Sequence, residues 1–90
     1  MLNKKIQDAI NNQIKYELDS AYLYLSMSAY FETNNLPGFA SWMRMQANEE
    51  QSHAMKFFDY IHDRGGRVAL QAVDQPQAEW ESALKVFEQV

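Results

Sequence analysis

Hydrophobic and polar positions recur along two long stretches of the chain with the period of an α-helix. No Gly or Pro interrupts the residues before Pro37, and none interrupts those between Gly38 and Gly65. We therefore predict helices over about 3–33 and about 37–64, each well beyond the average length of about 11–12 residues. Two long helices joined by a short loop form an antiparallel hairpin.

Residues at both ends of the second predicted helix carry the usual end signals. Asn34 or Asn35 is expected to cap its start, with Pro37 in the first turn. Gly65 and Gly66 are expected to end it in a left-handed conformation.

The rest of the chain reads as a connection followed by the start of a helix. Mixed polarity and Pro76 break any period, so a crossover is predicted over about 65–80. A third helix is predicted to start at about 81 and to run to 90. The apolar residues that it places on one side are Leu84, Phe87 and Val90.

Each long helix carries a heptad-like stripe, which is the geometry of a helical bundle core. The first stripe is Ile10, Ile14, Glu17, Ala21, Tyr24, Ser28 and Phe31. The second is Phe39, Met43, Gln46, Glu50, His53, Phe57 and Tyr60. Glu17, Glu50 and His53 break the apolar pattern. A carboxylate in a core needs a partner, a proton or a bound cation.

The hairpin register predicts that these three side chains meet. With the loop centred near residue 35, Glu17 and His53 are equally far from it, and Glu50 lies three residues nearer. All three therefore lie within about one turn of the same height. Carboxylates with an imidazole suit iron, manganese or zinc. Glu-x-x-His on a bundle helix is typical of di-iron carboxylate proteins, which take further Glu from two other helices.

Other interpretations of the same residues are open. Glu17 would point outward if the stripe were assigned about a turn wrong, and His53 would be a core histidine if it bonded Tyr24 or Glu17 without metal. Tyr24 is either core packing or a hydrogen-bond donor to a ligand carboxylate. Glu49 lies about 100° around the helix from Glu50, which favours a solvated position.

Composition excludes several other classes of site and partner. The 90 residues contain no Cys, which excludes disulfides, thiolate zinc sites and iron–sulfur clusters. The net charge of −4 argues against a nucleic-acid partner. No run of about 20 apolar residues and no signal peptide are visible, so we expect a cytoplasmic protein without a membrane partner. The 12 aromatic residues exceed what a hairpin can bury alone.

Several segments together carry a resemblance to a known family. They are Ile14–Leu18, Leu23–Ser28, Gly38–Met43, Glu49–Ala54, Asp59–Ile61 and Leu84–Glu88. The sequence resembles the N-terminal half of a prokaryotic non-haem ferritin. This resemblance implies an all-α fold, in which a ferritin-like hairpin forms half of a four-helix bundle. It also implies a homo-oligomeric cage that oxidises ferrous iron with oxygen or peroxide and stores the ferric mineral.

The resemblance also implies a role for individual residues. Glu17 would bind one iron, Glu50 would bridge two irons, and His53 would complete the first. Tyr24 is similar to the tyrosine hydrogen-bonded beside that centre, which gives four catalytic residues. Glu49 is similar to a residue that contributes to an accessory third iron site, and so joins the metal ligands.

Two features of the resemblance indicate whether the protein binds haem and whether the chain holds all the ligands of the iron site. The haem-binding branch has Met directly after the bridging Glu, whereas this chain has Gln51, so a di-iron centre without haem is expected. The family's remaining ligands would come just beyond Val90. The chain would then be a fragment, half of a split ferritin that needs a complementary C-terminal half, or one of two copies that complete the site together.

Ferroxidase activity with iron storage is the predicted function. The alternative is a helical assembly or interaction module whose metal site is incomplete or lies symmetrically between subunits. A di-iron oxygenase is disfavoured, because no substrate-pocket residues can be identified.

Overall fold

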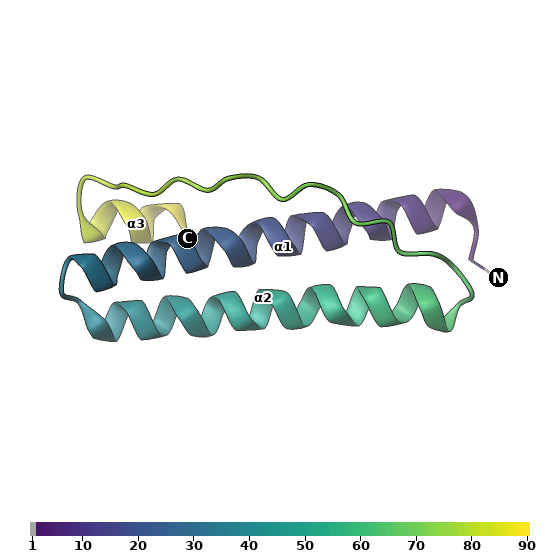
Figure 1. The fold of residues 1–90 in the computed structure, drawn as a ribbon, viewed down its shortest axis with the longest axis horizontal. Helices are drawn as coiled ribbons and strands as arrows, with labels where there is room; N and C mark the ends of the chain where they lie inside the picture. Colours follow the sequence, from purple (N-terminus) through teal and green to yellow (C-terminus); the bar gives the residue numbers. More distant parts are fainter. Residues whose placement is uncertain (1) are drawn as a thin grey trace.

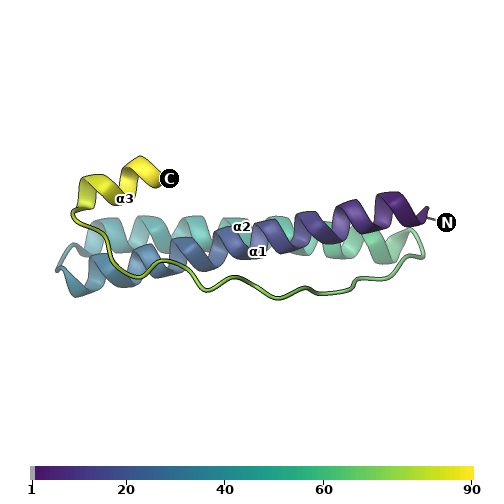
Figure 2. The same cartoon turned by 90° about the horizontal axis from the view of Figure 1, so that it is seen from above.

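The computed structural model describes residues 2–90, which form three helices and no strand. Helix α1 covers Lys4–Thr33, α2 covers Pro37–Asp63 and α3 covers Ala83–Gln89. Figure 1 shows α1 and α2 side by side and antiparallel along the 49 Å length of the molecule. The crossover then returns to the loop end, and Figure 2 shows it on the opposite side of the hairpin from α3. The predicted hairpin, crossover and third-helix start are confirmed.

The predicted cap of α2 is wrong, because both asparagines serve the end of α1 instead. The Asn34 side chain donates a hydrogen bond of 2.8 Å to the Tyr30 carbonyl oxygen. Asn35 turns the chain in the left-handed region at φ 59°. Leu36 precedes α2 without a side-chain hydrogen bond. The predicted left-handed stop after α2 is present at Gly65, where φ is 73°.

The buried face of α2 lies about one position away from the predicted stripe. Its members are Ala40, Met43, Ala47, Ala54 and Ile61. Small alanines at a contact allow two helices to approach closely, so this face packs on α1. Phe39 and Tyr60, which the stripe placed inside, are 44% and 39% exposed. The predicted period therefore identifies the flank beside the contact face, and Glu50 and His53 lie on that flank.

Two core clusters hold the ends of the hairpin. The cluster near the loop is Met27, Phe31, Ala40, Met43 and Val86, and the cluster at the other end is Ile14, Ala54 and Ile61. The predicted apolar side of α3 is correct for Phe87, which packs against the cluster near the loop, and wrong for Leu84 and Val90, which are exposed. Val86, which was not predicted, is fully buried. The short α3 contacts this cluster through Ala83, Val86 and Phe87, and the Phe87 ring packs on Phe31 with ring centroids 5.6 Å apart.

Polar side chains of α1 fix the extended crossover along the helix. The pairs are Gln7 with Arg67, Asn11 with Arg67 and Ala69, Asn12 with Gln71, Asp19 with Asp74, and Ser26 with Gln77. Most of these bonds satisfy backbone groups of the crossover that have no helix or strand partner. Within residues 2–90 no helix has an apolar stretch of the length that crossing a membrane requires.

Candidate metal centre

Two carboxylates and one imidazole meet on one flank of the hairpin. Glu17 comes from α1, and Glu50 and His53 come from adjacent turns of α2. Each offers a ligand atom, and these atoms all lie within 4.8 Å of one another. His53 Nδ1 is 3.6 Å from Glu17 Oε2 and 3.9 Å from Glu50 Oε2. The structure thus brings together the three residues that the hairpin register places at one height; their role as metal ligands stays a prediction.

The two carboxylates of the cluster are more shielded from solvent than the imidazole. The Glu17 and Glu50 side chains are 16% and 23% exposed, whereas His53 is 40% exposed. Within residues 2–90 this is the one group of three or more acidic or histidine residues whose ligand atoms come this close. The three groups could hold a metal ion, and the exposure of His53 leaves the imidazole accessible to solvent.

The two carboxyl groups share a proton below about pH 7. The pKa of Glu50 is raised from 4.5 to about 7, first by its hydrogen bond to Glu17, then by burial and by the charge of Glu17. The pKa of Glu17 is lowered, mainly because its carboxylate accepts that bond, and also by a bond from Gln13 and by the charge of His53. A divalent cation between the carboxylates would replace this proton and relieve their repulsion.

Tyr24 and Glu49 lie at the edge of the cluster. Tyr24 packs against the core cluster near the loop, and no hydrogen bond joins it to a site carboxylate among the described residues. Its pKa is raised by burial and by the charges of Glu50 and Glu49. Glu49 is 61% exposed, and its Oε1 is 3.9 Å from His53 Nε2. The imidazole thus has Glu17 and Glu50 on one nitrogen and Glu49 on the other.

Sequence reasoning missed Gln13, whose side chain contacts the cluster from α1. Its Nε2 donates a hydrogen bond of 3.2 Å to Glu17 Oε1. The available signal was the spacing of four residues between Gln13 and Glu17, which puts two helical side chains side by side.

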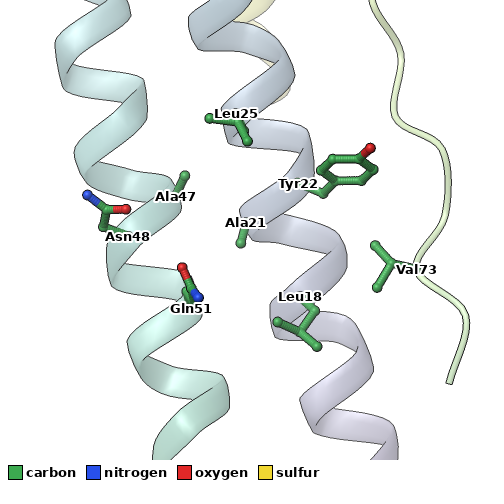
Figure 3. Close-up of a pocket in the computed structure, with 8 residues that line it drawn as sticks. All are labelled: Leu18, Ala21, Tyr22, Leu25, Ala47, Asn48, Gln51 and Val73. Atoms are coloured by element: carbon green, nitrogen blue, oxygen red, sulfur yellow. The ribbon is translucent and has the colours of Figure 1, made fainter. Parts of the chain in front are cut away.

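An apolar groove of about 360 Å³ is lined by both long helices and the crossover. Figure 3 shows its lining, which is Leu18, Ala21, Tyr22, Leu25, Ala47, Asn48, Gln51 and Val73. The groove contains no carboxylate and no imidazole, so it offers no comparable ligand set. Gln51 lines it although the neighbouring Glu50 belongs to the cluster. The groove was not predicted, because the crossover supplies Val73.

Comparison with known proteins gives concordant results. A family model described as a ferritin-like domain matches residues 7–90. A bacterial non-heme ferritin of Bacteroides fragilis is 47% identical over 90 residues, which are 100% of this chain and 57% of that protein. A bacterial non-heme ferritin of Staphylococcus saprophyticus is 41% identical over 88 residues, covering 98% and 53%. The chain therefore spans little more than half the length of these relatives.

Solved structures give the same result in three dimensions. An engineered closed form of the Archaeoglobus fulgidus ferritin superposes with a TM-score of 0.98 at 52% identity, covering 100% of this chain and 55% of that one. The open-pore ferritin of the same archaeon gives 0.97 at 52% identity, covering 100% and 56%.

Proposed function

The chain belongs to the ferritin-like family, and from this premise we propose that it serves in iron storage. Ferrous iron would bind at the Glu17–Glu50–His53 cluster, be oxidised there, and be stored as ferric mineral in a cage built from many subunits. The observation that carries the proposal is the close approach of two carboxylates and an imidazole on one flank of the hairpin. Iron is the substrate and the cargo of this reaction.

The ligand set fits the chemistry of iron oxidation. We assign Glu17 and His53 to the first iron, and Glu50 to a bridging position between the first iron and the second. Two ferrous ions supply two electrons, which reduce oxygen to hydrogen peroxide or peroxide to water with uptake of two protons. Carboxylate oxygens are hard ligands and favour the higher charge of ferric iron. The protein therefore needs no nucleophile of its own.

Glu49 and Tyr24 have supporting roles in this proposal. Glu49 faces the outer nitrogen of His53 at 3.9 Å and would contribute to an accessory iron site there. Tyr24 lies in the electrostatic field of Glu50 and would donate a hydrogen bond to a ligand carboxylate once an ion is bound.

The site requires ligands beyond those of this hairpin. Glu17, Glu50 and His53 offer three groups, and a pair of irons needs more. We propose that the open flank is covered by further helices, from the remainder of a longer protein, a complementary chain or another copy. Large exposed apolar side chains on the hairpin, including Phe39, Trp42 and Tyr60, support such a contact.

Aerobic addition of ferrous iron tests the activity. We expect ferric absorbance to appear faster with the protein than in buffer, and to slow in Glu50→Ala and His53→Ala. His62→Ala is the matched control, because His62 is exposed on the same helix and lies outside the cluster. Failure of the folded protein to accelerate oxidation would remove the ferroxidase proposal for this chain.

A second candidate is a helical assembly module with an incomplete metal site. The observation that favours it is the open flank, where His53 is 40% exposed and the described residues offer one three-member ligand set. Anomalous diffraction at the iron edge and the mass in solution distinguish the two. Iron at Glu17, Glu50 and His53 in an oligomer supports storage, whereas a metal-free oligomer supports the assembly module.

A further inference from the structure

We infer that Gln13 is a positioning residue for the metal centre, holding one oxygen of Glu17 so that the other faces the bound ion. The inference rests on the proposed function, because it concerns the same site. Gln13 itself would not touch the metal. Its action would be to fix the orientation of a ligand before the ion arrives.

The two oxygens of Glu17 have different partners. Oε1 accepts a hydrogen bond of 3.2 Å from Gln13 Nε2. Oε2 lies 3.6 Å from Nδ1 of His53 on the neighbouring helix. An ionised carboxylate can only accept hydrogen bonds, so the amide of Gln13 must present its NH₂ group to it. The direction of the bond is therefore set by chemistry.

This bond restricts how Glu17 can bind an ion. A glutamate side chain turns about three bonds, and a free carboxylate can chelate one metal ion through both oxygens. With Oε1 engaged by Gln13, the oxygen presented to the cluster is Oε2, which favours attachment through a single atom. A hydrogen-bonded ligand carboxylate is also restrained in orientation, and loss of such a partner typically costs about 10–100-fold in metal affinity or activity.

Gln46 provides an internal comparison on the other helix. It precedes Glu50 by four residues, as Gln13 precedes Glu17, and both glutamines are partly buried. Among residues 2–90, however, no hydrogen bond joins Gln46 to Glu50, whereas one joins Gln13 to Glu17. Spacing alone therefore does not create the contact, and Gln46→Met is a matched control for Gln13→Met.

Cobalt(II) is a suitable probe, because it accepts the same oxygen and nitrogen ligands as ferrous iron and, unlike ferrous iron, is stable in air during the titration. The purified protein is titrated with cobalt(II), and affinity and the visible absorption band are recorded. We expect Gln13→Met to bind cobalt about 10-fold or more weakly. We also expect its band to change intensity, because the intensity depends on coordination number. Gln46→Met should match the wild type.

Two further measurements separate positioning from a merely structural role. Metal-free Gln13→Met should remain folded at the titration temperature, with a thermal midpoint only slightly below that of Gln46→Met, because it loses one hydrogen bond. Gln13→Lys keeps an N–H donor at similar reach, and should recover the wild-type band. Wild-type affinity and band in Gln13→Met would overturn the inference alone. Failure of the folded wild-type protein to bind cobalt would overturn the proposed function and the inference with it.

Discussion

The proton shared by Glu17 and Glu50 makes the stability of the metal-free protein depend on pH, and Glu50→Gln should abolish this dependence. In the folded protein the pKa of Glu50 is raised from 4.5 to about 7. A raised pKa means that folding favours the protonated form. The stabilisation is therefore complete below pH 4.5 and is lost as the pH rises through 7. In Glu50→Gln the introduced amide replaces the protonated carboxyl and would donate the same bond to Glu17 at every pH.

The size of the effect follows from the change in pKa. Each pKa unit corresponds to about 1.4 kcal/mol, so a rise from 4.5 to about 7 corresponds to about 3 kcal/mol in the free energy of unfolding. The Glu50 side chain is 23% exposed, so solvent screens part of this interaction and about 3 kcal/mol is an upper bound. The lowered pKa of Glu17 contributes stability that is fully present above pH 4.5 and is lost as the pH falls below it, so it adds no pH dependence between pH 5 and pH 8. Between pH 5 and pH 8 the wild type should therefore lose about 2–3 kcal/mol that Glu50→Gln retains.

Denaturant unfolding at pH 5 and at pH 8, with a chelator present, measures this difference. We expect Glu50→Gln to be more stable than the wild type at pH 8, and the two proteins to be much closer at pH 5. Glu81→Gln is the control, because Glu81 is exposed and lies outside the cluster. The same pH dependence in the wild type and in Glu50→Gln would refute the shared proton.

Two further predictions concern the fold that supports the site. Asn11→Ala should lower the free energy of unfolding by about 1–3 kcal/mol, because Asn11 is only 6% exposed and bonds two crossover backbone groups. Faster hydrogen exchange at the Ala69 N–H would report this loss. Asn12→Ala is the control, and because Asn12 is exposed its loss of stability should be smaller. Phe31→Ala should cost about 3–5 kcal/mol in denaturant unfolding, because Phe31 is fully buried. A similar loss in the 66% exposed Met45→Ala would contradict that reasoning.

The helical hairpin could be predicted because its signals are local. The helical period and the lack of Gly and Pro can be read within a few turns of the chain. The left-handed conformation at Gly65 could be predicted from the residue type, because glycine adopts it without strain. The cap could not be predicted in the same way. An Asn between two helices can cap the second or close the first, and both use the same side-chain chemistry. Here Asn34 bonds Tyr30, so it closes the first helix.

The height of the candidate site could be predicted, but not its angular position on the helices. Height depends only on distance from the loop, which can be counted along the chain. The angular position depends on which neighbour each helix packs against, and the contact of Ala47 and Ala54 with α1 decides it. The bond from Gln13 to Glu17 depends on side-chain rotation, which periodicity does not describe. The groove beside Val73 depends on the path of the crossover.

The offset of one position between the predicted and observed faces of α2 has a consequence for binding. If Glu50 and His53 lay on the contact face, α1 would seal them, and an ion could reach them only by opening the hairpin. Ala47 and Ala54 occupy that face instead, and the side chains that we propose as ligands lie on the adjoining flank. Helix packing and the proposed metal binding thus use different sides of α2. The contacts between α1 and α2 therefore keep Glu17 close to Glu50, while the cluster stays accessible to a cation.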